Sequence, residues 1–150
     1  MTETPTYSEV YEHLMLVRRI NRRIWIAQLE HDELQSCLLP KAITYDKDAV
    51  QTSPGDRMGD IAGEVLDMEK KLRALQRRKA TAFIQIRREI DLLDNEDQRD
   101  IPAAFFLARR PMHAIADAQH LSLSSVYRIR KDAIQNLRVL LAKDLKSQEK

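Results

Sequence analysis

The chain has 150 residues, a formal net charge of +2, 43% hydrophobic and 32% charged residues. This size predicts one or two small domains, and the composition is ordinary for a helix-rich protein. Three glycines and five prolines are fewer turn residues than a strand-rich fold requires. We therefore predict an all-α protein. A single cysteine, Cys37, excludes an internal disulfide, and we expect it to be a small buried apolar group.

The sequence carries no sign of secretion or membrane insertion. Residues 1–5 lack the basic and apolar blocks of a signal peptide. No uninterrupted apolar run approaches the ~20 residues that a membrane span needs. We expect a cytoplasmic protein with no membrane partner.

Charge is distributed unevenly. Residues 109–150 contain nine Lys and Arg against four Asp and Glu, a net charge of +5, whereas the first 108 residues carry −3. A basic C-terminal segment attached to a slightly acidic remainder indicates that the end of the chain binds an anion.

The first predicted element is one long helix over residues 8–38, which Pro40 ends. Two sets of apolar residues recur every seven positions and form a coiled-coil seam: Val10, Val17 and Ile24, and Ile20, Ala27 and Leu34. Trp25 is interpreted as hairpin or interface core rather than as a platform for stacking bases. A connection over 41–57 follows, with a turn at residues 53–56.

A second long helix is predicted from Asp56 or Met58 to Leu93. Its apolar residues follow steps of three and four: Met58, Ile61, Val65, Met68, Leu72 and Leu75. Two such seams most simply pair as an antiparallel hairpin over residues 7–94, although a seam could also pair with a second copy in a homodimer. The basic run over residues 70–88 is either a solvated helix face or a second surface for nucleic acid or acidic protein.

The C-terminal segment, residues 95–145, is predicted to fold as a helix-turn-helix domain. N-cap residues at 94–97 begin a helix whose apolar side is Ile101, Ala104, Phe105 and Ala108, with Pro102 in its first turn. A support helix over 112–119 buries Ile115 and Ala116, and His120 forms the turn. Leu121 is expected to fill the corner between the support helix and the next helix, and Ser122 is expected to cap that next helix. Its buried stripe is Val126, Ile129, Ala133, Leu137 and Leu140.

The outward face of that last helix has the chemistry of a DNA reader. Over 123–131 it would lie in the major groove of double-stranded DNA. The candidate DNA-binding residues are Ser122, Ser124, Ser125, Tyr127, Arg128, Arg130 and Lys131. Arg128 is the first choice for a base, because arginine reads guanine bidentately. Phosphate contacts are expected from Ser124, Arg130 and Lys131, and the hydroxyls at the start of the helix can also bond phosphate. Tyr127 could contact either a base or a phosphate.

These residues resemble region four of bacterial sigma factors. The resemblance rests on Ile115-Ala116, Leu121-Ser122, Ser125-Val126-Tyr127-Arg128, Ala133 and Leu137-Arg138. With the segment over 50–58 between two long helices, the whole layout resembles the small sigma-like regulators of phages and prophages of Gram-positive bacteria, the ArpU/RinA-like group. The resemblance implies control of phage gene expression in a bacterial host cell, with RNA polymerase as a possible protein partner. Gln119 and His120 depart from the pattern, which has an apolar residue and glycine there.

No other constellation predicts chemistry. The four histidines have no metal-ligand spacing to nearby carboxylates, and the serines have no adjacent base, so we predict no metal, no cofactor and no catalytic residue. The alternative to DNA binding is a protein-interaction module that uses the long hairpin, such as a phage-encoded inhibitor of a host or defence complex.

Overall fold

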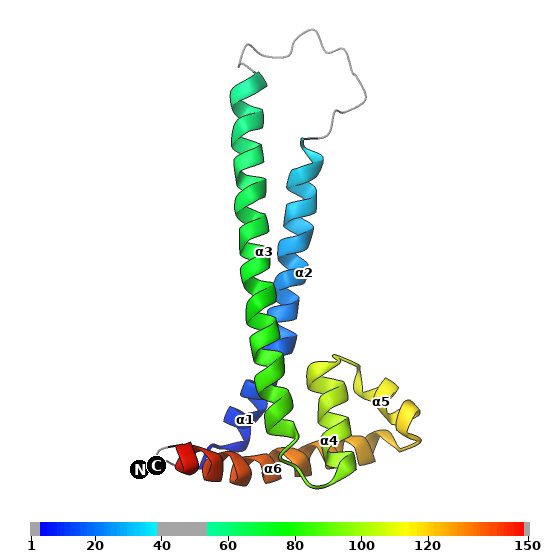
Figure 1. Cartoon of the computed structure of the whole chain (residues 1–150). Helices are drawn as coiled ribbons and strands as arrows, with labels where there is room; N and C mark the ends of the chain where they lie inside the picture. Colours follow the sequence, from blue (N-terminus) through cyan, green and yellow to red (C-terminus); the bar gives the residue numbers. More distant parts are fainter. Residues whose placement is uncertain (1–3, 39–53, 149–150) are drawn as a thin grey trace. The chain divides into compact units, whose positions relative to one another are not determined.

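The computed structural model describes residues 4–38 and 54–148. It is all-helical over these residues, which confirms the predicted fold class. The helices are α1 (Tyr7–Leu14), α2 (Leu16–Ser36), α3 (Pro54–Ile90), α4 (Glu96–Pro102), the π-helical segment η1 (Ala103–Leu107), α5 (Met112–Gln119) and α6 (Leu123–Gln148) (Figure 1). The predicted connection lies outside the described residues except for its last positions. There the predicted turn is wrong, because Pro54 begins α3, a position where its missing N–H costs nothing.

The chain divides into two compact units. Unit 1 consists of Met1–Arg19 and Lys79–Lys150, and unit 2 consists of Ile20–Arg78. This division differs from the predicted boundary near residue 94. α1 and the last turns of α3 belong with the C-terminal helices because α1 packs against α6 and His13 on α1 bonds to Glu89 on α3.

The predicted single helix over 8–38 is two helices separated at Met15. A capping box begins α1, in which the Glu9 N–H donates to Thr6 Oγ1 at 3.1 Å and the Thr6 N–H donates to the Glu9 carboxylate at 3.2 Å. The backbone bonds nevertheless continue through the junction, since the Met15 N–H donates to the Tyr11 carbonyl and the Arg19 N–H to the Met15 carbonyl. α1 packs against α6 and bonds to the end of α3 through His13, whereas α2 beyond Ile20 bonds to α3 within unit 2 through His31.

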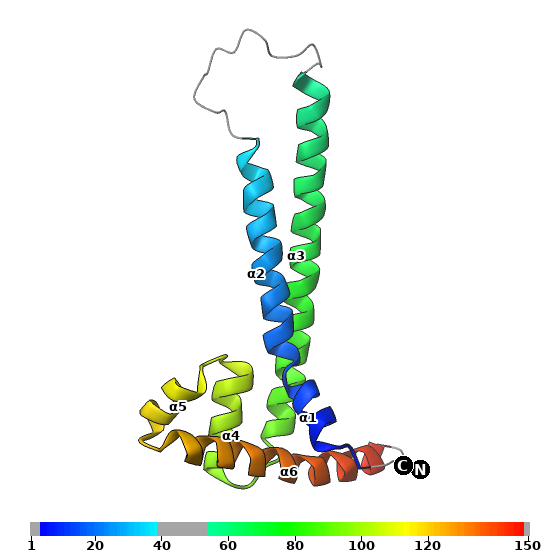
Figure 2. The same cartoon turned by 180° about the vertical axis from the view of Figure 1, so that it is seen from behind.

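In unit 2, α2 and α3 lie side by side and run antiparallel (Figures 1 and 2). His31 on α2 bonds to Glu69 on α3. Nearer the start of α2, a groove is lined by Arg23 and Ala27 of α2 with Leu75 and Arg78 of α3. Earlier residues of α2 therefore lie against later residues of α3, which is the antiparallel arrangement. The buried apolar residues are Ile20, Ile24, Ala27, Val65, Leu72 and Leu75. These are positions of the predicted seams.

Two predictions for this region are wrong, and one of the two alternatives for Trp25 is excluded. Met58 is 48% exposed rather than in the seam, because α2 ends at Ser36 and its turns do not reach that part of α3. Trp25 is 61% exposed, which excludes it from the core between α2 and α3. Cys37 is exposed and follows the last helical residue of α2, so it is not a buried apolar group.

Unit 1 has its core among α1, the end of α3, α4, η1 and α6. Phe106, Leu14, Ile86, Ile90, Ile101, Ile134 and Leu137 are among its largest fully buried side chains. Asn95 caps α4 by accepting from the Gln98 N–H at 3.1 Å, inside the predicted capping segment. Pro102 was predicted in the first turn, but it is the last residue of α4 and is buried.

The segment after Pro102 shifts the helical register. Proline lacks an N–H and disturbs the preceding turn, and the chain continues through the π-helical segment η1, closed by the Ala108 N–H bond to the Ala103 carbonyl at 2.9 Å. The wider turn buries Phe106, five residues after Ile101, whereas the α-helical period predicted that Phe105 and Ala108 would be buried. Phe105 is half-buried and Ala108 is exposed.

Candidate nucleic-acid interface

The junction between α5 and α6 has the geometry of a tight turn. His120 follows α5 with φ 56° and ψ 40°, in the left-handed region that favours glycine. The Leu121 N–H donates to the Ala116 carbonyl at 3.0 Å, and the Ser125 N–H donates to Ser122 Oγ at 3.2 Å. The predicted cap by Ser122 is therefore confirmed. The predicted helix boundaries at Met112, Gln119 and Leu123 also match.

The inner faces of α5 and α6 form one core cluster. Its buried members are Ile101, Met112, Ile115, Ala116 and Val126, with Leu121 and Ile129 partly buried against them. Ala116 is 4% exposed, and the absence of a larger side chain there allows α6 to lie close to α5. Gln119 is exposed, so its departure from an apolar residue removes no polar group from water.

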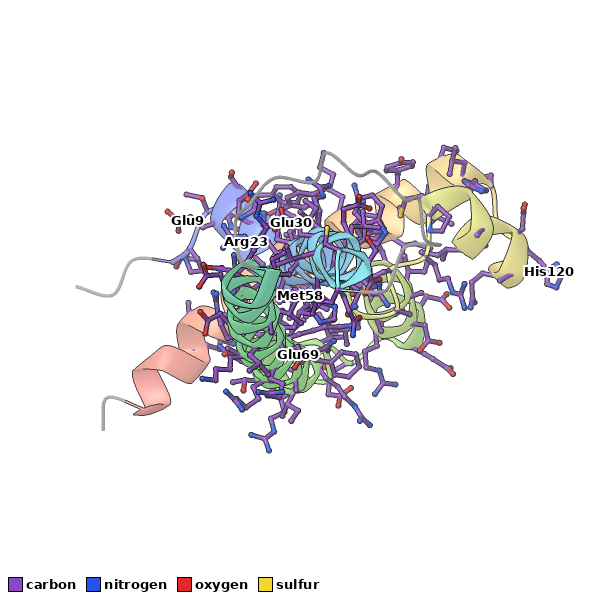
Figure 3. The ribbon with its side chains drawn as sticks, turned by 90° about the horizontal axis from the view of Figure 1, so that it is seen from above. Glu9, Arg23, Glu30, Met58, Glu69 and His120 are labelled. Carbon is purple, nitrogen blue, oxygen red and sulfur yellow. The ribbon has the colours of Figure 1, made fainter. Side chains whose placement is uncertain are left out.

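The outer face of α6 brings most of the predicted site residues together. Ser124, Tyr127, Arg128 and Lys131 are exposed along its first turns, and Ser122 is exposed just before them. Ser125 is half-buried, and its Oγ accepts a 2.8 Å hydrogen bond from Ser122 Oγ. With this bond, the Ser125 hydroxyl proton remains to donate elsewhere. Figure 3 shows the His120 side chain projecting outward at the turn between α5 and α6.

Arg130 does not share this exposed face. It is half-buried, and its guanidinium carbon lies 4.8 Å from the centroid of the Phe105 ring, 5.0 Å from that of Tyr127 and 5.5 Å from that of Tyr11. Such distances permit cation–π attraction. Its Nε is buried without a hydrogen-bond partner. The arrangement holds the Arg130 side chain among rings, one of which, Tyr127, is itself a predicted site residue.

Arg18 is a residue that the sequence reasoning missed. Its Nε donates to the Phe105 carbonyl at 2.8 Å, and its Nη2 donates to the Arg110 carbonyl at 3.1 Å. Its guanidinium carbon lies 4.0 Å from the centroid of the Phe105 ring. Arg18 thereby ties the N-terminal part of unit 1 to the segment immediately before α5. In the sequence it is one of four arginines close together on a helix, and nothing in that pattern distinguishes it.

Two histidine–carboxylate pairs were also missed. In unit 1, His13 Nε2 lies 2.6 Å from a Glu89 carboxylate oxygen, and this hydrogen bond raises the pKa of His13. In unit 2, His31 lies between Asp32 and Glu69 with both ring nitrogens 3.1 Å from carboxylate oxygens. The hydrogen bond to Asp32, followed by that to Glu69, raises the pKa of His31.

Within residues 4–38 and 54–148, no three His, Cys, Asp or Glu side chains gather as metal ligands would. None of the helices over the same residues combines the length and apolar character needed to cross a bilayer. Comparisons with protein-family models, curated proteins and solved structures found no match to this chain.

Proposed function

We propose that this protein is a sequence-specific DNA-binding regulator of transcription, in which residues 123–131 of α6 enter the major groove. One observation carries the proposal: the first turns of α6 expose Ser124, Tyr127, Arg128 and Lys131 together, while Val126 on the opposite side is fully buried against α5. A helix fixed on one side and displaying cations and hydroxyls on the other suits insertion into a groove lined by phosphates.

The exposed residues have distinct proposed roles. Arg128 contacts a base, because its planar guanidinium matches the acceptors of guanine. Lys131 and Ser124 contact phosphates, and Tyr127 contacts either a base or a phosphate. The N-terminus of α6 adds a partial positive charge where the Ser125 hydroxyl is available to donate to an anion.

Arg130 has a different role in this proposal from a phosphate contact. The guanidinium carbon of this half-buried residue lies within cation–π distance of the Phe105 and Tyr127 rings, and both rings belong to unit 1. Arg130 therefore acts as a positioning residue that restricts the Tyr127 ring on the DNA-facing side of α6. Removing it would affect DNA binding through Tyr127 rather than through a lost phosphate contact.

The test is fluorescence anisotropy over a salt series with two short duplexes, the DNA that flanks the protein's own gene and a scrambled control. We expect tighter binding to the native duplex and a steep salt dependence. Arg128→Ala should weaken native-duplex binding by about 1–3 kcal/mol and reduce discrimination between the duplexes. Lys131→Ala should weaken both and lower the salt slope by about one unit.

The matched control is Lys71→Ala, which removes an exposed lysine from the basic run of α3 in unit 2. It should leave both affinity and salt slope unchanged. If Lys71→Ala lowers the slope as much as Lys131→Ala does, the basic run is the DNA surface and α6 is not. Unchanged affinity in both Arg128→Ala and Lys131→Ala would likewise reject the assignment to α6.

The proposal extends to biological role through the sigma-like pattern of residues 115–138. We propose a phage or prophage regulator whose helix-turn-helix reads DNA while its long helical hairpin contacts RNA polymerase or another protein. Weak and equal binding to both duplexes would instead favour the alternative, a protein-interaction module that acts through the hairpin.

A further inference from the structure

The outer surface of α2 in unit 2 carries a second seam that α3 does not cover. Ile26 is 43% exposed and Leu29 is 51% exposed, and Trp25 beside them is 61% exposed. Arg22, Ile26, Leu29 and Glu33 follow steps of four, three and four residues, the spacing of one helix face. The opposite face of α2, which includes Ile24, Ala27 and His31, is buried.

This outer stripe has a charge gradient along its length. Arg22 stands at its N-terminal end and Glu33 at its C-terminal end, and both are exposed. Arg23 and Glu30, which are also exposed, flank the stripe on the side of the groove that α2 forms with α3. Figure 3 marks Arg23 and Glu30 on α2. A partner helix that fits this stripe must offer acidic groups beside the arginines, apolar side chains at the centre and basic groups beside the glutamates. The stripe itself, reversed in direction, has that pattern.

We propose that a second copy of this chain packs antiparallel on the outer face of α2, about a two-fold axis. Ile26 of each copy then faces Leu29 of the other, and Arg22 faces Glu33. Both pairs fit one antiparallel register, because residues that face each other across a two-fold axis have residue numbers with a constant sum, and the two sums are equal. Two-fold symmetry makes each contact occur twice, as in isologous dimers. A parallel arrangement would instead place arginine against arginine and glutamate against glutamate.

The dimer should be weak and concentration-dependent. Standard stable interfaces contain about 20–30 residues from each partner, and the stripe offers a much smaller set centred on Trp25, Ile26 and Leu29. We expect a dissociation constant in the micromolar range. This inference is independent of DNA binding, and it assigns to Trp25 the interface role that remained open once the core between α2 and α3 was excluded.

The decisive experiment is sedimentation velocity of the full chain over a concentration series, with charge-reversal variants. Arg22→Glu and Glu33→Arg should each weaken self-association about tenfold or more, since each creates two like-charge contacts. An equimolar mixture of these two variants should associate at least as well as the wild type, because every cross-contact again joins opposite charges. The double variant carrying both reversals should also recover self-association.

A second comparison tests the apolar centre. Leu29→Gln should shift the chain to monomer, whereas Leu66→Gln, at a leucine of α3 that is 56% exposed and outside the stripe, should not. Circular dichroism should show equal helicity for both variants, because both positions face solvent in one copy. A wild type that stays monomeric up to several hundred micromolar would overturn the proposal. So would equal effects of Leu29→Gln and Leu66→Gln, or no recovery in the mixed charge variants.

Discussion

Replacing Arg18 by alanine tests whether a side chain far along the sequence from α5 and α6 holds the candidate site in place. Arg18→Ala removes the 2.8 Å bond to the Phe105 carbonyl, the 3.1 Å bond to the Arg110 carbonyl and the stacking on the Phe105 ring. All of these groups belong to unit 1. The Phe105 carbonyl lies in η1, and the Arg110 carbonyl lies in the segment that joins η1 to α5, so we expect local loosening around that segment as well as lower stability.

The magnitude follows from the exposure of the three contacts. A hydrogen bond to a charged group contributes about 1.5–3 kcal/mol, and the low end applies because the Arg18 side chain is only half-buried and the bond to Arg110 is exposed. Cation–π stacking near the surface adds roughly 0.5–1 kcal/mol. Because neighbouring contributions are not additive, we expect a total loss of about 2 kcal/mol.

The assay is urea unfolding followed by circular dichroism, with Arg19→Ala as the matched control. Arg19 is the next residue, and its side chain is 52% exposed and paired with the equally accessible Glu12, so its removal should change the free energy of unfolding by less than about 1 kcal/mol. Hydrogen exchange should show faster exchange at the Arg110 and Ala114 amides in Arg18→Ala. A loss below 0.5 kcal/mol, or equal losses in both variants, would refute the reasoning.

Three further predictions concern stability. Phe106→Ala should lower the free energy of unfolding by about 3–5 kcal/mol because the ring is fully buried, whereas Leu92→Ala at a 41% exposed position should cost less than about 1 kcal/mol in the same urea titration. The hydrogen bond to Glu89 raises the pKa of His13 above 6.5, so the stabilisation from this pair should be complete below about pH 6.5 and should decline as pH rises through the higher folded pKa. In urea unfolding curves measured over a pH series, His13→Gln should flatten this decline in the free energy of unfolding. An unchanged pH dependence in His13→Gln would contradict the prediction. His120→Gly should raise the urea midpoint by the equivalent of about 0.5–1 kcal/mol, since φ 56° strains a side chain but not glycine, and a lower midpoint would show that the His120 side chain stabilises the turn.

Periodicity was sufficient to predict the elements that bury one face in a regular way. The buried apolar residues of α2 and α3 in unit 2 are positions of the predicted seams, and α5 and α6 begin where capping and turn residues indicated. These features depend on interactions within a helix or between adjacent helices, which leave a regular trace in the sequence. The exposure of Ser124, Tyr127, Arg128 and Lys131 follows from the same rule applied to the opposite face.

The sequence could not predict features that depend on a change of helical period or on a partner distant along the chain. Pro102 alone fits the first turn of a helix as well as its end, and nothing local indicates the π-helical segment that buries Phe106. Trp25 was placed in a core or an interface by its hydrophobicity alone. Only the positions of α2 and α3 show that it faces away from the hairpin seam.

The contacts of Arg130 illustrate why charge alone is a poor guide to a nucleic-acid interface. Arg128 and Lys131 are neighbours of Arg130 in sequence and share its charge, but 100° of helical rotation per residue places it beside Tyr11 and Phe105 rather than in solvent. A basic run on a helix therefore contains residues that can reach an anion and residues that fix the helix on its support. Substituting every cation of α6 together would mix these effects, and only single substitutions read against folding stability can separate them.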